Sequence, residues 1–243
     1  MATVVDLNSL GFQYPNSENW IVRDLSFSVA AGEFLSIVGG SGVGKSTILR
    51  LVAGLLEAGS GTIEISGEAA EGRRRRALVF QDGRLMPWRN VARNVRLGLE
   101  GLDLTADIVN QRIDEVLNLT GLGEFKDRWP HQLSGGQVQR VGIARALAVQ
   151  PDILLMDEPF SAVDTITRQS LQQELVRIWQ ASGAAILFIT HDIEEAAYLS
   201  DRVIVLKGQP AEIVHERHVE IERPRQRNSE ELFRLAANIA TFL

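Results

Sequence analysis

The stretch Gly39–Ser46 reads GGSGVGKS and fits the pattern G-x-x-x-x-G-K-[ST]. It follows Phe34–Val38, a short β-branched run that predicts a buried strand, and it leads into Ser46–Leu55, whose pattern predicts a helix. In a strand, glycine-rich turn and helix of this kind, successive backbone N–H groups face one anion, and the positive end of the helix lies behind them. We therefore predict a phosphate-binding loop.

The two polar side chains that end this loop predict what it binds. Lys45 supplies a point charge to the β- and γ-phosphates of a nucleotide, and Ser46 offers a hydroxyl ligand to Mg²⁺. The alternative, a glycine-rich turn with a surface lysine, does not account for the strand before it and the helix after it. The predicted nucleotide contacts of this segment are Gly39, Gly40, Ser41, Gly42, Val43, Gly44, Lys45, Ser46 and Thr47.

Strand and helix signals alternate along the rest of the chain, which predicts an α/β fold with a mostly parallel, RecA-like sheet of the P-loop NTPase type. Alternation in Leu25–Val29 and Thr62–Ile65 predicts a small antiparallel sheet, and the scarcity of strand signals from Asp82 to Pro151 predicts an inserted helical part. The further strands expected are Ala77–Phe80, Ile153–Met156, Ala185–Thr190 and Arg202–Leu206. The further helices expected are Gln111–Leu119, Gly136–Ala148 and Arg168–Ser182.

Composition excludes several classes of protein. The 243 residues include no cysteine, so disulfides, zinc-thiolate sites and thiol catalysis are absent. Lysine and arginine total 25 against 31 aspartates and glutamates, a net charge of −6, which argues against a dedicated nucleic-acid binder. The apolar runs fall short of the ~20 residues that span a bilayer, and Met1–Asp6 does not begin a signal peptide. We expect a cytosolic location.

A pair of carboxylates ends the apolar run that begins at Ile153. Asp157, at the end of this predicted strand, would hold Mg²⁺ through water. Glu158 would polarise the attacking water as a general base. Two carboxylates at the start of a loop are common, so the nearby phosphate loop is what favours the catalytic interpretation.

A second anion site is predicted at Leu133–Gln137, which reads LSGGQ and opens a helix. A serine hydroxyl and the backbone N–H groups at such a helix start can face an anion, and the predicted contacts are Ser134, Gly135, Gly136 and Gln137. One chain does not need two phosphate cradles for one nucleotide. A two-fold dimer resolves this, since each nucleotide would then lie between Lys45 of one protomer and Ser134 of the other.

With these motifs in this order, nearly the whole chain resembles the ATP-binding subunits of ABC transporters. By this resemblance Gly39–Ser46 is the Walker A loop, Leu133–Gln137 the signature motif and Asp157-Glu158 the Walker B carboxylates. The resemblance also implies that Tyr14 stacks on adenine and that Gln81 contacts Mg²⁺ and the attacking water. It further implies that Ser161–Asp164 is the D-loop and that His191 contacts the γ-phosphate.

Several of these residues have plainer alternatives. Tyr14 could be a hairpin aromatic, Gln81 a polar residue at a strand end, and His191 a structural hydrogen-bonding histidine. Arg73–Arg76 is most simply a solvated turn, with a nucleic-acid or lipid-headgroup patch as the minority interpretation.

The segment Leu85–Val95 further resembles the LLPW…NV pattern of the nitrate, sulfonate, taurine and bicarbonate importer ATPases, as do Glu222–Arg225 and a short tail helix at Glu230–Ile239. Trp88 and Met86 would anchor a coupling helix of a membrane subunit, or else they are core residues of the helical part. This branch implies ATP and Mg²⁺ as cofactors, a homodimer or a paired ATPase chain, transmembrane permease subunits, and indirectly an extracytoplasmic solute-binding protein.

The resemblance therefore implies an ATPase of an importer for a small anion, peripheral at the cytoplasmic side of the inner membrane and without nucleic acid. Alternatives are an exporter or lipid-transport ATPase, a soluble ABC-type ATPase acting on nucleic acid or ribosomes, and a nucleotide-binding regulatory module. The expected organisation is one ABC ATPase domain, residues 1–243, made of a core with the antiparallel part at 1–81 and 151–215, a helical part at 82–150 and a tail at 216–243.

Overall fold

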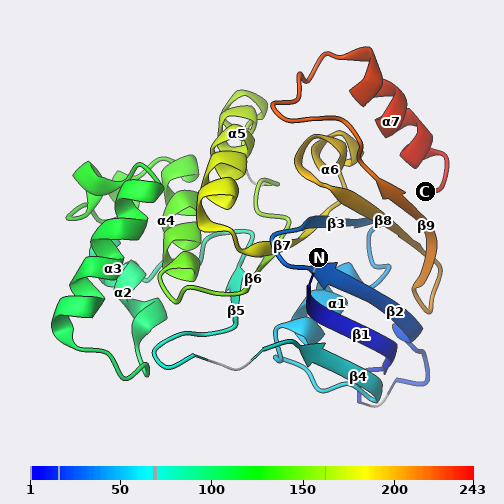
Figure 1. Ribbon diagram of the computed structural model, residues 1–243, viewed down its shortest axis with the longest axis horizontal. Helices are drawn as coiled ribbons and strands as arrows, with labels where there is room; N and C mark the ends of the chain where they lie inside the picture. The colour runs from blue at the N-terminus through cyan, green and yellow to red at the C-terminus, as the bar shows by residue number, and fades with distance from the viewer. Residues whose placement is uncertain (1, 16, 68–69, 162) are drawn as a thin grey trace. The chain divides into compact units, whose positions relative to one another are not determined.

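The computed structural model describes residues 2–15, 17–67, 70–161 and 163–243 (Figure 1). The chain forms two compact units, one made of residues 1–67 and 185–243 and the other of residues 68–184. Within the described part of the chain, none of the helices is both long and apolar enough to span a bilayer.

An antiparallel sheet in the first unit has the order β2-β1-β4. Its strands are β1 (Thr3–Phe12), β2 (Val22–Ala30) and β4 (Ser60–Ile65), and Leu7 of β1 pairs with Phe27 on one side and Ile63 on the other. The sequence predicted β2 and β4 but missed the central strand β1. Register shifts after Leu7, with Ser9 at φ 47°, break the period-2 pattern by which a strand is recognised.

The first unit also holds the strands β7 (Ala185–Thr190), β3 (Phe34–Gly39), β8 (Arg202–Lys207) and β9 (Glu212–His218), in that order. The first three run parallel and β9 is antiparallel. Val38 of β3 pairs with Thr190 of β7, so the carboxyl ends of these two strands are neighbours. The helices of this unit are α1 (Lys45–Val52), α6 (Ile193–Leu199) and α7 (Glu230–Ala240), and α7 packs on α6 (Figure 1).

The second unit contains the parallel pair β5 (Arg76–Val79) and β6 (Ile153–Asp157) together with four α-helices. These are α2 (Val91–Leu99), α3 (Ala106–Leu119), α4 (Gly135–Leu147) and α5 (Thr165–Ser182), with 3₁₀ turns at Gly123–Phe125 and Pro130–Gln132. Contacts of α4 with α2, α3, α5 and β5 make it the centre of this unit. Every residue of 82–151 is described and none lies in a strand, as predicted for the helical part.

Candidate functional site

The loop between β3 and α1 is curled by glycines. Gly42 and Gly44 adopt φ 78° and 113°, a region that favours glycine, and a β-carbon at Gly44 would lie 2.9 Å from Cγ2 of Ile21. At Gly39 a β-carbon would lie 2.6 Å from the carbonyl oxygen of Leu206. By contrast, no heavy atom would come within 4 Å of a β-carbon at Gly40 or Gly42. The loop is thus tight at its two ends and open in the middle, as a phosphate cradle requires.

Lys45 lies inside this loop. Its side chain is buried, and Nζ donates hydrogen bonds to the carbonyl oxygens of Gly39 at 2.8 Å and Gly40 at 3.0 Å. The ammonium group is therefore held at the loop that the sequence predicted to bind phosphate. Ser46, in the first turn of α1, is half-buried beside it.

Tyr14 is connected to the helix that follows the loop. Its hydroxyl lies 3.3 Å from Oγ1 of Thr47, and Phe12 packs edge-on at 5.0 Å between ring centroids. The residue remains 36% exposed. Tyr14 is thus fixed near the phosphate loop with part of its face open, which is compatible with stacking on a base.

His191 follows β7 at the same sheet edge as the phosphate loop, because Val38 and Thr190 are register partners. The turn around it is braced. The Thr190 hydroxyl donates to Glu195 Oε2 at 2.5 Å and accepts from the Asp192 N–H at 3.0 Å. Asp192 in turn accepts the Glu195 N–H at 3.1 Å as the N-cap of α6. Both neighbours of His191 are therefore fixed.

The second unit brings Gln81 and the two carboxylates to one edge. Val79 pairs with Met156 in parallel β5 and β6, so Gln81 and Asp157 both lie at the carboxyl ends of these adjacent strands. Glu158 adopts φ 44°, rare for a residue with a β-carbon, and its carbonyl accepts from the Ser161 hydroxyl at 2.9 Å. The side-chain oxygens of Gln81 and Asp157 are of the kind that Mg²⁺ binds in proteins, and so is the hydroxyl of Ser46 in the first unit.

The signature residues form a capping box at the start of α4. Ser134 Oγ accepts the Gln137 N–H at 3.3 Å, and Gln137 Oε1 accepts the Ser134 N–H at 2.8 Å. Ser134 and Gly135 are exposed, whereas a β-carbon at Gly136 would lie 3.2 Å from Cγ2 of Thr167 on α5. The glycine at 136 lets α4 pack closely on α5, and the exposed serine marks an open helix start.

Asp164, in the predicted D-loop, is the N-cap of α5 and accepts the Thr167 N–H at 3.1 Å. Hydrogen bonds from Thr167, and from the backbone of Ile166, lower the pKa of its exposed carboxyl. Ala162 of the same motif lies outside the described residues. Asp164 therefore fixes where α5 begins.

Two residues of α4 that the sequence analysis missed connect the signature helix to the segment around Gln81. Gln139 Nε2 donates to the carbonyl oxygen of Phe80 at 3.3 Å, and Arg145 donates to those of Gly83 at 2.7 Å and Arg84 at 2.8 Å. Burial lowers the pKa of Arg145, partly offset by Asp82. The sequence feature that could have indicated these two residues is their spacing, because positions 139, 142 and 145 are three residues apart and position 142 is a glycine in the middle of the helix.

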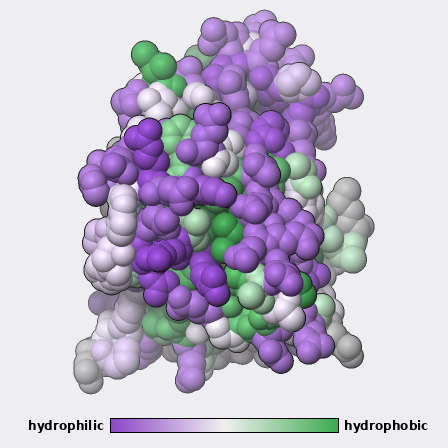
Figure 2. Space-filling view, turned by 90° about the vertical axis from the view of Figure 1, so that its left-hand side faces the viewer, coloured by the Kyte–Doolittle hydropathy of each residue, from purple (hydrophilic) through white to green (hydrophobic). Residues whose placement is uncertain are grey.

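The segment that resembles the importer ATPases is ordered by a buried asparagine. Asn94 accepts from the Met86 N–H at 2.7 Å and donates to the carbonyl oxygen of Arg89 at 2.8 Å. Trp88 is 68% exposed, so the alternative that it is a core residue is wrong; Met86 is half-buried. Figure 2 shows the left-hand side of the view in Figure 1, which is mostly hydrophilic with small apolar areas near its middle.

The three arginines directly before β5 are bound to their surroundings, and the fourth of the run, Arg76, is the first residue of that strand. Arg73 and Arg75 pair with Asp152 at 3.1 and 3.6 Å, and Arg74 donates to the carbonyl oxygen of Glu100 at 2.6 Å. This arrangement favours neither a fully solvated turn nor a cationic patch for nucleic acid or lipid. These contacts hold the start of β5 against other residues of the second unit.

Comparison with known proteins agrees with this geometry. Residues 22–161, more than half of the chain, match the family described as ABC transporter. The aliphatic sulfonates import ATP-binding protein SsuB 1 of Xanthomonas axonopodis pv. citri is 46% identical over 87% of this chain and 84% of its own length. The taurine import ATP-binding protein TauB of Pseudomonas aeruginosa (strain PAO1) is 44% identical over 88% of this chain and 82% of its own.

A solved structure supports the fold. It is an ATP-binding cassette, dimeric in a post-hydrolysis state with ADP and Pi bound, with a TM-score of 0.73 and 30% identity over 90% of this chain and 100% of the other. The predicted α/β fold of the P-loop NTPase type, with an antiparallel sheet and a helical part, is confirmed. The phosphate loop, the capped signature helix and the strand-end carboxylates thus occur together in a chain that belongs to the ABC transporter family.

Proposed function

We propose that this chain powers the uptake of a small anionic solute of the sulfonate, taurine, nitrate or bicarbonate type, through separate membrane subunits. As a member of its family the chain binds and hydrolyses ATP, and it is the ATP-binding subunit of an importer. The observation that carries the proposal is the pairing of Val38 with Thr190, which sets the phosphate loop and His191 at one sheet edge. The names of the two import proteins support the solute class.

In the proposed cycle two copies of the chain sandwich two ATP molecules. Lys45 and the loop N–H groups of one copy bind the phosphates, Tyr14 stacks on the adenine, and Ser134 to Gln137 of the other copy complete the site. The open centre of the loop and the exposed start of α4 support these roles. The dimeric state of the related cassette supports the pairing of copies.

For hydrolysis, Glu158 accepts a proton from the attacking water, and His191 and Gln81 position the γ-phosphate and that water. Ser46, Gln81 and Asp157 would hold Mg²⁺, which neutralises phosphate charge when bound. Most of the rate gain comes from positioning and charge stabilisation. The braced turn around His191 supports such a role, because a preorganised group loses little freedom in the transition state.

Closing of the dimer would move the helical part, residues 82–150, and with it Trp88 and the membrane subunit docked there. The chain would then lie at the cytoplasmic side of the inner membrane, held by its partners. A solute-binding protein outside would deliver the solute. The exposure of Trp88 supports a docking role.

The test is the mass of the Glu158→Gln chain in solution, with and without Mg·ATP. Blocking hydrolysis should trap the closed pair, so ATP should convert monomer to dimer. A chain that binds ATP yet stays monomeric would require a different ATPase chain as partner. If the chain does not bind ATP at all, the phosphate-loop assignment fails.

A further inference from the structure

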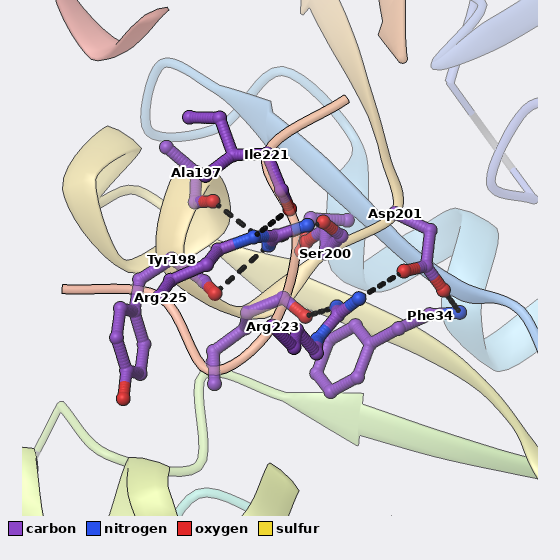
Figure 3. A network of polar contacts seen from close by, with 10 residues as sticks. Phe34, Ala197, Tyr198, Ser200, Asp201, Ile221, Arg223 and Arg225 are labelled. Carbon is purple, nitrogen blue, oxygen red and sulfur yellow. Dashed lines mark hydrogen bonds and ion pairs between the residues drawn. The ribbon is translucent and has the colours of Figure 1, made fainter. Parts of the chain in front are cut away.

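The helix that follows His191 is too short to satisfy its own backbone. α6 has seven residues, and the last carbonyls of a helix have no partner within it. The Ser200 N–H bonds Ala196, which leaves the carbonyls of the next four residues, 197–200, to other donors. Two arginines of the chain's tail supply these donors (Figure 3).

Arg225 does most of this capping. Its Nη1 donates to the carbonyl oxygens of Ala197 at 3.1 Å, Tyr198 at 2.9 Å and Ser200 at 2.7 Å, while Nε donates to Ile221 at 2.9 Å. Burial, followed by the charge of Arg223, lowers the pKa of Arg225 to about 10, so it stays cationic at neutral pH. A cation at the C-terminal end of a helix also opposes the negative end of the helix dipole.

Arg223 connects the C-terminal end of α6 to the start of strand β3. It donates to the carbonyl oxygen of Leu199 and pairs with Asp201 (Figure 3). The other carboxylate oxygen of Asp201 accepts the N–H of Phe34, at the start of β3, at 3.0 Å. The strand that leads to the phosphate loop and the helix that follows His191 are thus held by one carboxylate and one tail arginine.

A third arginine reaches further along α6. The guanidinium of Arg227 lies 3.7 Å from the centroid of the Tyr198 ring. Its burial lowers its pKa, while Tyr198 and then the negative charges of Glu195 and Asp192 raise it. Those two acids belong to the turn that braces His191. The tail positions 223, 225 and 227 therefore all contact the C-terminal part of α6 or the residue that follows it.

We propose that Arg225 is a positioning residue for ATP hydrolysis: by fixing the C-terminal end of α6, it holds His191 in place at the other end. A seven-residue helix is only about 10 Å long and moves as a unit, so a tilt of α6 after the loss of its C-terminal contacts also displaces its first turn. The inference rests on the proposed role of His191.

The experiment is a double-mutant cycle on the full chain, with ATP turnover measured for wild type, Arg225→Met, His191→Ala and the double variant. A misplaced catalytic group costs about ten- to a hundredfold in kcat, and we expect that loss in R225M with the KM for ATP within about twofold. In the H191A background R225M should add less than about a twofold loss, because the group that it positions is gone. Arg225→Lys, a cation that can still donate to the carbonyls, should restore part of kcat.

The matched control is Arg234→Ala, which removes an exposed arginine of α7 paired with Glu230. It should leave kcat unchanged. If H191A lowers kcat while R225M lowers it equally in both backgrounds, or not at all, the positioning role is overturned and the proposed function stands. If H191A itself leaves kcat unchanged, the role of His191 and the inference fail together.

A second measurement decides the case where R225M does not fold. The ¹⁵N signals of the His191 imidazole, assigned by comparison with H191A, should shift in Arg225→Gln, which removes the cation, and stay closer to wild type in R225K and unchanged in R234A. Unchanged signals in folded R225Q, together with a wild-type kcat, would overturn the inference.

Discussion

Arg145 donates a hydrogen bond from Nη2 to the carbonyl oxygen of Gly83 at 2.7 Å, so the signature helix α4 holds the segment that follows Gln81. Gly142, one turn earlier, faces the same segment, since a β-carbon there would lie in van der Waals contact with Cα of Gly83 at 3.4 Å. The signature motif and the Gln81 segment therefore belong to one packed arrangement within the second unit.

We expect Arg145→Met to lower kcat for ATP while leaving ATP affinity near that of wild type. The loss of charged donors to two carbonyl groups should also cost about 1.5–3 kcal/mol of unfolding free energy. Steady-state kinetics and denaturant unfolding check this, with Arg96→Met on the exposed face of α2 as the control. An unchanged kcat in a destabilised R145M would limit Arg145 to a structural role.

Much of the fold could be predicted because buried parallel strands are continuous apolar runs. β7 has the predicted bounds, and β3, β6 and β8 each extend one residue further at the carboxyl end. Most of the missed elements have weak local patterns: β1 contains bulges, β9 alternates half-buried and exposed residues beside β8, and α6 is too short for a helical period. The nine-residue helix α2 was also missed. The ends of elements also shifted, as in α3, which starts at Ala106 behind the N-cap Thr105.

The parts of the candidate site that are contiguous in the sequence could be predicted, and the parts that depend on contacts between distant residues could not. A glycine-rich loop, an LSGGQ helix start and paired carboxylates are each contiguous in sequence. Arg145 and Gln139 act through carbonyls about 60 residues away along the chain, and the carbonyls at the end of α6 that Arg225 contacts lie more than 20 residues before it. A sequence pattern does not show which backbone carbonyl a side chain will contact, so these contacts could be found only in the structure.

If each site is shared between two copies, Lys45→Ala and Ser134→Ala should each abolish turnover alone and recover it when mixed. Random pairing makes half of the dimers mixed, and each mixed dimer has one intact site, so we expect about a quarter of the wild-type rate for independent sites. ATPase activity against mixing ratio measures this. No recovery in a mixture that forms mixed dimers would place Ser134 and Lys45 in the same functional site of one chain.

Tyr14→Ala should weaken ATP binding by about 1–3 kcal/mol, the range for base–aromatic stacking. Tyr14→Phe keeps the ring and loses only the contact with Thr47, so it should cost under about 1 kcal/mol. Calorimetric titration with ATP compares the two. Equal affinities of Y14A and wild type would make Tyr14 a hairpin aromatic without contact to the base.

Asn94→Leu should destabilise the second unit by at least about 2 kcal/mol, because the buried amide makes four hydrogen bonds to backbone atoms of the residues at 86, 89 and 90. Denaturant unfolding measures this loss. The nearby Arg93→Ala, at an exposed position, should unfold like wild type. A small loss for N94L would mean that the segment is ordered by its apolar contacts instead.

Trp88→Ala should separate ATP hydrolysis from coupling. The side chain is 68% exposed, so its removal should leave melting temperature, ATP affinity and turnover of the isolated chain unchanged. An aromatic anchor buried in an interface contributes about 2 kcal/mol or more, so docking to the membrane subunits should weaken roughly thirtyfold. Co-purification with those subunits, and the ATPase rate that they stimulate, measure this against Ile108→Ala, another exposed apolar residue of the same unit. If W88A still binds the membrane subunits tightly, the contact does not lie in the segment Leu85–Val95. Among the described residues of that segment, Trp88 is the most exposed large apolar side chain.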